Sequence, residues 1–419
     1  MKSAKSVFKP GFLMIAVMLI FNPMIISATE ITDETSEGEE VVYTKPAPED
    51  HILKDKFKQT EAKPFKLLGS EILPGETRSL HWRSGQSIGS FEVPIPVIVV
   101  NGTKPGPVLC LTSAVHGDEL NGIEIVRQVI HDIDPKKLRG TVVGVPVVNI
   151  DGFWRKARYI GDRRDLNRFF PGKKDGSHPS RVAYSLFNEI IVHCDALVDL
   201  HTGSYYRENL PQLRADITIP QVSDMVKAFG LITALQSAGP VGSLRRAATS
   251  AGIPAVVVEI GGPLSLEPEM VNSGVKSVRT LLGSLGMVRK INFWTTPQPV
   301  YYSSKWVRSD AGGILINIKK LGAKINKGDQ LGEIKDPITN ATTPVTSPFD
   351  GIILGRAQNQ FVSPGFALYH IGLKSSPEEL EEEAIKEKKK IVEQKVEELD
   401  INGNNEGVDS KPDEKKQEK

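Results

Sequence analysis

The stretch "CLTSAVHGDELNG" (Cys110–Gly122) changes at His116 from an apolar run to polar residues of the kind that bind metals. The run before the histidine is typical of a buried strand, and the segment after it, "ELNGIEIVRQVIHDI", has apolar residues at helical spacing. His116 and Glu119 therefore lie three residues apart where a strand gives way to a helix. This is either an ordinary strand end before a helix or one half of a metal site.

The same alternation continues along the chain. Apolar runs recur in "GTVVGVPVVN", "ALVDLHTG" and "IPAVVVEIGG", and amphipathic stretches such as "HPSRVAYSLFNEIIVHC" separate them. Continuous Val, Ile and Leu runs that alternate with helices are typical of parallel strands covered on both faces. We therefore predict an α/β fold with a mostly parallel, mixed sheet flanked by helices. Sites in such folds form beyond the carboxyl ends of the strands.

Ligand-type residues stand at the ends of three of these runs. His116, with Glu119 just beyond it, ends the first run, His201 ends the second, and Glu259 ends the third. Two histidines and a carboxylate that leave a fourth position open for water form the ligand set of catalytic zinc sites. Asp199, two residues before His201, is a candidate acceptor for an imidazole N–H. The sequence predicts that these side chains converge on one ion.

Simpler explanations exist for some of these residues. Glu119 alone is also expected in the first turn of a helix, where the dipole favours a carboxylate. Glu259 is harder to explain in this way, because a carboxylate at the end of "AVVV" is costly to bury without a partner. The remaining histidines are expected to be structural or exposed; they are His51, His81, His131, His178, His193 and His370.

An arginine-rich segment, "RKARYIGDRRDLNRFFPG" (155–172), lies between the first two ligand segments. Guanidinium groups bind carboxylates in bidentate fashion and stabilise oxyanions. A solvated basic loop is the alternative, and it fits Arg163 and Arg164 as well as a functional role does.

The motifs "HGDE", "DLNRFFPG", "DLHTG" and "VVVEIGG", in this order and spacing, resemble the succinylglutamate desuccinylase/aspartoacylase family of the zinc carboxypeptidase-like superfamily. The resemblance runs from about Pro94 to Leu373. It implies one Zn²⁺ per chain with His116, Glu119 and His201 as ligands, and Glu259 as the general base. It further implies that Arg158 stabilises the oxyanion and that Asn167 and Arg168 bind the carboxylate of the substrate.

The pattern changes near "INFWTTPQPVYY", after which short apolar runs are divided by glycines. This pattern predicts an all-β module. It resembles a biotinyl/lipoyl-like β-sandwich, which we expect to narrow the entrance to the zinc cleft. The expected domain organisation is a signal peptide (1–28), a mostly irregular linker (29–64), the catalytic domain (65–290), the β-sandwich (291–374) and a charged, largely disordered tail (375–419).

The composition limits the cellular setting and the partners. Three lysines, an apolar run and a small-residue exit near Ala28 are typical of a secretory signal. We therefore expect a periplasmic or secreted protein with no stable membrane insertion after cleavage. The net charge of +1 gives no reason to expect nucleic acid as a partner. Cys110 and Cys194 are expected to be buried thiols, since two cysteines cannot form a disulfide framework.

Together these features predict an exported zinc-dependent hydrolase. It would cleave an amide bond of an N-acyl amino acid or a related carboxylate-bearing substrate. Export leaves open a zinc carboxypeptidase that acts on peptides or cell-wall peptides. A non-catalytic binding protein on the same fold is the alternative from a different class. The partner expected for either enzyme is a small molecule or peptide with a free carboxylate.

Overall fold

The structure is a computed structural model that describes residues 60–88, 91–230, 232–289 and 300–373. These residues all belong to one compact unit. The predicted signal peptide, the predicted tail and most of the predicted linker lie outside the described residues. In the described part of the chain, no helix has the length and apolar character needed to span a membrane.

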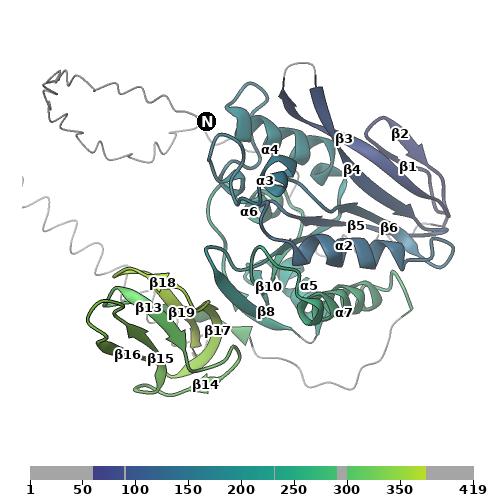
Figure 1. Ribbon diagram of the computed structural model, residues 1–419. Coiled ribbons are helices and arrows are strands. Elements are labelled where there is room, and N and C mark those ends of the chain that lie inside the picture. The colour runs from purple at the N-terminus through teal and green to yellow at the C-terminus, as the bar shows by residue number, and fades with distance from the viewer. Residues whose placement is uncertain (1–59, 89–90, 231, 290–299, 374–419) are drawn as a thin grey trace, which may run out of the picture. The chain divides into compact units, whose positions relative to one another are not determined.

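The larger part of the described chain is built on one mixed sheet (Figure 1). The strands that this part of the chain contributes are β3 (Thr77–Ile88), β4 (Phe91–Asn101), β5 (Lys104–Ser113), β6 (Arg139–Val145), β7 (Ala196–His201), β8 (Arg207–Ala215), β9 (Thr233–Gln236) and β10 (Ala255–Gly261), and a small hairpin of β1 (Phe65–Leu67) and β2 (Ser70–Ile72) precedes them.

The centre of this sheet is parallel, as predicted. Strand β5 pairs in parallel with β6 and β7, and β7 pairs in parallel with β10. Antiparallel strands flank this centre, because β4 pairs with β6 on one side and β8 pairs with β10 on the other. The carboxyl ends of β5, β7 and β10 therefore meet at one rim, which is where the sequence places the ligand-type residues.

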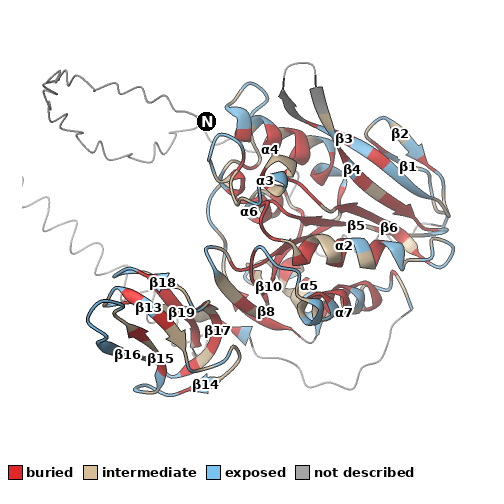
Figure 2. Cartoon of the chain, in the orientation of Figure 1, coloured by how far each residue is buried: buried red, intermediate tan, exposed pale blue. Residues whose placement is uncertain are grey.

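Helices cover both faces of the sheet (Figure 2). Residues of α4 and α6 pack on one face with Cys110, Val143 and Leu197, while residues of α2, α5 and α7 pack on the other with Leu109 and Val198. Neighbouring residues of one strand thus enter opposite cores, which explains the continuous apolar runs. The helices are α2 (Asn121–His131), α3 (Ile150–Trp154), α4 (His178–Glu189), α5 (Pro220–Phe229), α6 (Leu244–Ser250) and α7 (Pro268–Ser284), with the 3₁₀ turns η2 (Leu166–Arg168) and η3 (Ile191–His193).

The C-terminal part is all-β, as predicted. Its core lies between two layers of strands and includes Leu315, Leu331, Ile353 and Tyr369. Strand β17 pairs with β8, so one layer of this module continues the main sheet. The strands are β11 (Val300–Tyr301), β12 (Ser303–Arg308), β13 (Gly313–Asn317), β14 (Lys324–Ile325), β15 (Gln330–Lys335), β16 (Thr342–Thr346), β17 (Gly351–Ala357), β18 (Phe361–Val362) and β19 (Ala367–Leu373).

The expectation of two free thiols is wrong. Cys110 in β5 and Cys194 just before β7 form a disulfide, with their Cα atoms 5.8 Å apart. Both residues are buried, as expected. The pairing follows from the strand order, because β5 and β7 are neighbours in the sheet although the two cysteines are 84 residues apart in sequence. No local pattern in the sequence reports that order.

Candidate active site

His116 and Glu119 stand in the turn between β5 and α2. The backbone N–H of Glu119 donates to the carbonyl of His116 over 3.2 Å, which closes the turn. Gly117 is required there, because a Cβ atom at this position would lie 2.0 Å from the backbone carbon of Gly152. The turn therefore packs directly on the N-terminal part of α3, and both side chains are held toward the rim.

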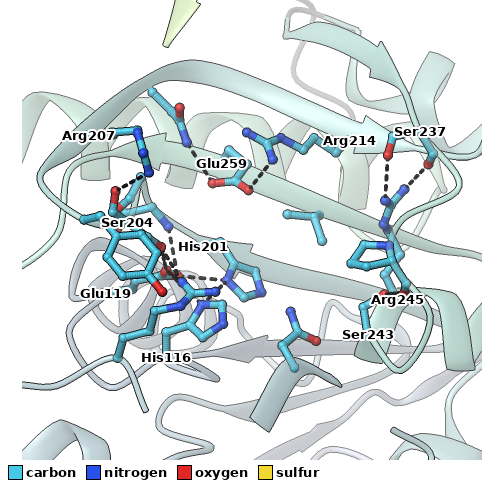
Figure 3. A pocket seen from close by; sticks show the side chains of 18 of the residues that line it. His116, Glu119, His201, Ser204, Arg207, Arg214, Ser237, Ser243, Arg245 and Glu259 are labelled. Carbon is cyan, nitrogen blue, oxygen red and sulfur yellow. Dashed lines mark hydrogen bonds and ion pairs between the residues drawn. The ribbon is translucent and has the colours of Figure 1, made fainter. Parts of the chain in front are cut away.

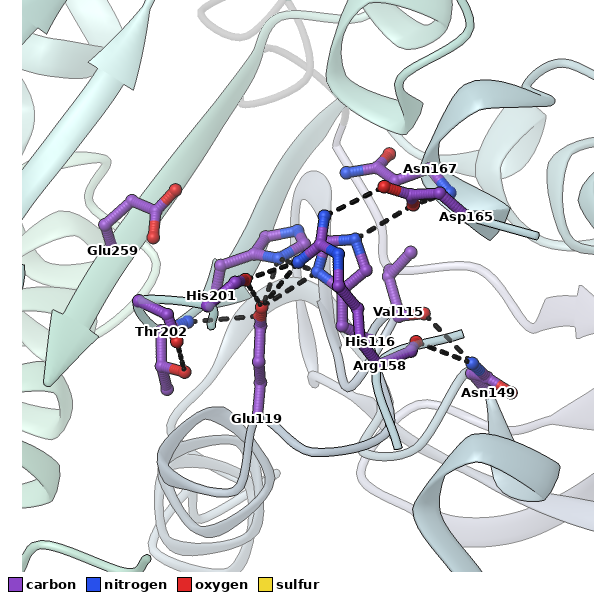
Figure 4. A network of polar contacts seen from close by, with 12 residues as sticks. Val115, His116, Glu119, Asn149, Arg158, Asp165, Asn167, His201, Thr202 and Glu259 are labelled. Atoms are coloured by element: carbon purple, nitrogen blue, oxygen red, sulfur yellow. Dashed lines mark hydrogen bonds and ion pairs between the residues drawn. The ribbon is translucent and has the colours of Figure 1, made fainter. Parts of the chain in front are cut away.

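His201, the last residue of β7, joins these two side chains (Figure 4). Nδ1 of His116 lies 2.9 Å from one carboxylate oxygen of Glu119, and Nδ1 of His201 lies 2.8 Å from the other. The two Nδ1 atoms are 3.2 Å apart. Ligand atoms of all three residues lie within 4.8 Å of one another, and all three residues are buried.

The far nitrogens of both imidazoles contact carboxylates. Nε2 of His201 lies 2.8 Å from Asp199, and Nε2 of His116 lies 3.1 Å from Asp165. Thr112 donates to the other oxygen of Asp199. Such partners fix the tautomer of an imidazole, since a neutral ring that donates through Nε2 presents a lone pair at Nδ1. Asp199 contacts the imidazole that the sequence predicts for it, whereas no sequence pattern points to Asp165 as a partner of His116.

Charge complementarity holds this cluster together. Burial alone would raise the pKa of Glu119, but the two neighbouring histidines bring it well below its ordinary value. Burial alone would lower the pKa of His201, but Asp199 and Glu119 raise it well above its ordinary value. Glu119 is therefore ionised and faces two imidazoles at the end of the sheet.

Glu259 lies near the end of β10, in register with His201 on β7. It is 9% exposed. Its side chain lies between two residues of β8, because Nδ2 of Asn209 donates to one carboxylate oxygen over 2.9 Å and Arg214 forms an ion pair with the other at 3.4 Å (Figure 3).

Arg158 lies beside the ligand cluster. It donates to Asp165 over 2.9 Å and to Glu119 over 3.4 Å, and it also bonds Ser204. Its guanidinium lies 5.5 Å from the centre of the Tyr205 ring. The residue is therefore held at the edge of the cluster by carboxylates on two sides.

Asn167 and Arg168 lie in η2 and line a pocket together with the His116, Glu119 and His201 cluster. Oδ1 of Asn167 accepts from the backbone N–H of Leu244 over 2.8 Å, which turns its amide nitrogen away from α6. The Arg168 side chain is 48% exposed and lies 3.9 Å from Asp165. Both residues are therefore available to a ligand in the pocket.

A cavity of about 250 Å³ brings these elements together. Every predicted site residue lines it: His116, Glu119, Arg158, Asn167, Arg168, His201 and Glu259. No sequence pattern singles out the other polar and aromatic residues of the wall, among them Ser204, Tyr205, Arg207, Asn209, Arg214, Ser237, Ser243, Arg245 and Trp306. Trp306 belongs to β12, so the C-terminal module supplies part of this wall.

Arg245 is a buried cation on this wall. It is 4% exposed and donates to the backbone carbonyl of Ser237. Burial, assisted by the neighbouring Arg214, lowers the pKa of Arg245 to about 10, so that it remains charged at neutral pH. The segment "SLRRAATS" has only the pattern of a short helix, so nothing in it marks Arg245 as a pocket residue. The one weak indication is that an arginine stands in the first turn of this helix, where the helix dipole disfavours a cation.

Arg207 is held by aromatic rings at the other end of the pocket. Its guanidinium lies 4.7 to 5.8 Å from the centres of Phe366, Trp306 and Tyr205. Its Nε donates to the carbonyl of Ala367. The cation thus joins β8 to the C-terminal module.

Comparison with known proteins finds relatives of this chain. A curated relative, the N-alpha-acetyl-L-2,4-diaminobutyric acid deacetylase of Halomonas elongata, is 25% identical over an alignment of 279 residues that covers 63% of this chain and 81% of that protein.

Solved structures share the fold. The product-bound ectoine utilization protein EutE (DoeB) from Ruegeria pomeroyi matches 75% of this chain and 100% of its own, with a TM-score of 0.65 and 22% identity. A succinylglutamate desuccinylase/aspartoacylase from Rhodobacter sphaeroides matches 70% of this chain and 95% of its own, with a TM-score of 0.63 and 23% identity. Residues 105–285 match the family model of the succinylglutamate desuccinylase/aspartoacylase catalytic domain, in agreement with the resemblance predicted from the motifs.

Proposed function

We propose that this protein is an exported zinc-dependent hydrolase that cleaves the amide bond of an N-acyl amino acid or a related carboxylate-bearing substrate. The observation that carries the proposal is the convergence of His116, Glu119 and His201 at one rim of the sheet, with Glu259 one strand away. The deacetylase activity named for the Halomonas elongata relative supports amide hydrolysis as the reaction.

The donor set fits zinc. Two Nδ1 atoms and a carboxylate converge, and the opposite nitrogen of each ring contacts Asp165 or Asp199. Imidazole together with one carboxylate is a common zinc ligand set in hydrolases, and carboxylate partners at the far nitrogen are typical of such sites. A zinc ion held by these three residues would acidify a water molecule and polarise the carbonyl of the substrate.

The residues around the cluster then have separate roles. Glu259 accepts a proton from the attacking water and returns it to the leaving amine. Arg158 stabilises negative charge on the carbonyl oxygen through its guanidinium. Asn167 and Arg168 bind the free carboxylate of the substrate and so fix the scissile bond relative to Glu259.

The charge of the pocket supports a carboxylate-bearing substrate. Arg245 is buried and lies against the carbonyl of Ser237, and Nε of Arg214 is buried with no hydrogen-bond partner in the described part of the chain. Arg168 is half-exposed and lines the same pocket. These cations leave positive charge for an anionic substrate to neutralise.

Two features support export. The N-terminal sequence has the pattern of a secretory signal. The buried disulfide between Cys110 and Cys194 fits an oxidising compartment, because disulfides are rare in reducing cytosol. We propose a periplasmic or secreted location on these grounds.

The test is a substrate panel with purified, metal-analysed protein. N-acyl amino acids that vary in acyl group and amine are compared with short peptides that have a free C-terminus, and the products are identified by mass spectrometry. One zinc per chain and release of a free amino acid from N-acyl amino acids are expected. Cleavage of the peptides alone would instead favour a carboxypeptidase, and the absence of both bound metal and hydrolysis would favour a binding protein.

A further inference from the structure

The carboxylate of Glu259 is held by side chains of a neighbouring strand, β8. Asn209, which is 4% exposed, donates its amide N–H to Oε2 over 2.9 Å. Arg214 lies 3.4 Å from Oε1. The two partners differ in kind, because the amide donates one directed hydrogen bond, whereas the guanidinium offers several donors and a charge.

Asn209 stands where the main sheet joins the C-terminal module. In the sheet it pairs with Gly261 of β10 on one side and with Gly355 of β17 on the other. The residue that donates a hydrogen bond to the carboxylate of Glu259 therefore also takes part in the pairing of β8 with β17 of the β-module.

Gly355 leaves the space that the Asn209 amide fills. A Cβ atom on Gly355 would lie 2.6 Å from Oδ1 of Asn209, a distance that real Cβ contacts do not tolerate. Glycine within a strand weakens the strand and often marks a close approach of another group. Here the approaching group is the far side of the amide that donates to Glu259.

We propose that Asn209 is a positioning residue for Glu259, and that Gly355 of the C-terminal module keeps the space this role requires. The proposal rests on the function proposed above, in which Glu259 is the general base. It makes the β-module part of the catalytic unit in addition to a wall of the pocket.

The physical reason lies in the competition between the two partners. With Oε2 bound to Asn209, the carboxylate meets Arg214 through one oxygen only. Without that donor, the carboxylate can rotate and pair with Arg214 through both oxygens, since bidentate pairing with a guanidinium is the stronger geometry. The base would then be turned toward Arg214 and away from the attacking water.

The kinetic test uses Asn209→Ala and Asn209→Leu, the second of which keeps roughly the shape of the side chain but cannot donate and adds no charge beside Glu259. We expect kcat to fall by about tenfold to a hundredfold, which is the cost of a displaced reacting group. KM should change by no more than about threefold, because the substrate-binding side chains are untouched. The zinc content per chain should not change.

A matched pair of glycine variants tests the role of the module. Gly355→Ala should lower kcat in the same way, because its methyl group displaces the amide of Asn209. Gly312→Ala is the control, since a Cβ there meets its nearest neighbour, Pro364, at an ordinary 3.5 Å. Equal kcat for the two alanine variants would overturn the role of Gly355.

A double-mutant cycle on thermal unfolding tests the contact without relying on activity. Asn209→Ala, Glu259→Ala and the double variant should give melting temperatures that depart from additivity by about 1 °C or more, as residues in contact do. If the wild type hydrolyses no substrate but the cycle is non-additive, the proposed function is wrong and the contact between Asn209 and Glu259 stands. Active wild type with unchanged kcat in both Asn209 variants, or an additive cycle, would overturn the inference alone.

Discussion

Glu259 and His201 occupy paired positions on neighbouring parallel strands, β10 and β7. The proposed base and one proposed metal ligand therefore leave the same rim of the sheet one strand apart. This spacing separates the two roles, because Glu259 contacts Asn209 and Arg214, whereas His201 contacts Glu119 and Asp199.

Replacement of the base should therefore stop turnover without removing the metal. We expect Glu259→Gln to lower kcat by about 10²- to 10⁴-fold, the usual contribution of a general base. Zinc content measured by elemental analysis should equal that of the wild type. A Glu259→Gln protein with bound zinc and full activity would contradict the assignment of the base.

The carboxylate behind His201 should control metal affinity. Asp199→Asn keeps the shape but removes the charge that orients the ring, and we expect zinc affinity to fall by about 10- to 100-fold. Competition with a chromogenic chelator measures this directly. Asp224→Asn is the control, because Asp224 is an exposed partner of Lys227 on α5. Equal zinc affinity of Asp199→Asn and Asp224→Asn would show that Asp199 does not strengthen zinc binding by His201.

The sequence alone predicts the proposed ligands and base but not the part of the pocket wall that β8 supplies. His116 and Glu119 share one local turn, and His201 and Glu259 end apolar runs, so local pattern and the rule for parallel strands suffice to bring them together. Strand β8 has no such signal, since "RENLPQLRA" mixes charges, a proline and few apolar residues. Its contributions to the pocket, Asn209 and Arg214, depend on pairing with β10 and β17, which lie far away in the sequence.

Recognition of the substrate's carboxylate should depend on Arg168. We expect Arg168→Ala to lower kcat/KM by about 10- to 100-fold, the effect of losing a hydrogen bond between charged groups. The loss should disappear with substrates whose carboxylate is amidated. Arg164→Ala is the control in the same segment, because Arg164 pairs with Asp162 and does not line the pocket. An equal loss with the amidated substrate would rule out the assigned contact.

The disulfide should contribute much of the stability of the parallel core. It closes a long loop between β5 and β7, and we expect the Cys110→Ala/Cys194→Ala variant to lose about 2–5 kcal/mol in the free energy of unfolding. Denaturant titration of wild type and variant measures the loss. A thiol assay on the unreduced, unfolded wild type should detect no free thiol. Two titratable thiols in that assay would contradict the pairing.

His370 should make the protein sensitive to mild acid. The ring is buried, stacks on Trp306 with centroids 4.6 Å apart, and contacts Ser304 through Nε2. Burial, with a smaller effect of Arg214, lowers the pKa of His370 to about 3. Below about pH 6.5, where a histidine in the unfolded chain gains a proton, the folded state does not, so protons favour unfolding and stability falls as the pH decreases.

The pH dependence of unfolding isolates this contribution. Between pH 7.5 and 5.0, the depressed pKa of His370 should lower the free energy of unfolding by about 2 kcal/mol, and His370→Gln should lack that part of the decrease. His178→Gln is the control, because His178 is exposed, and its free energy of unfolding should decrease between these pH values as much as that of the wild type does. The comparison uses the difference between the two pH values for each protein, so any packing that His370→Gln loses at both pH values cancels. A His370→Gln protein with the same decrease as the wild type would mean that the imidazole is protonated in the folded state and that Ser304 and Trp306 do not shield it from water.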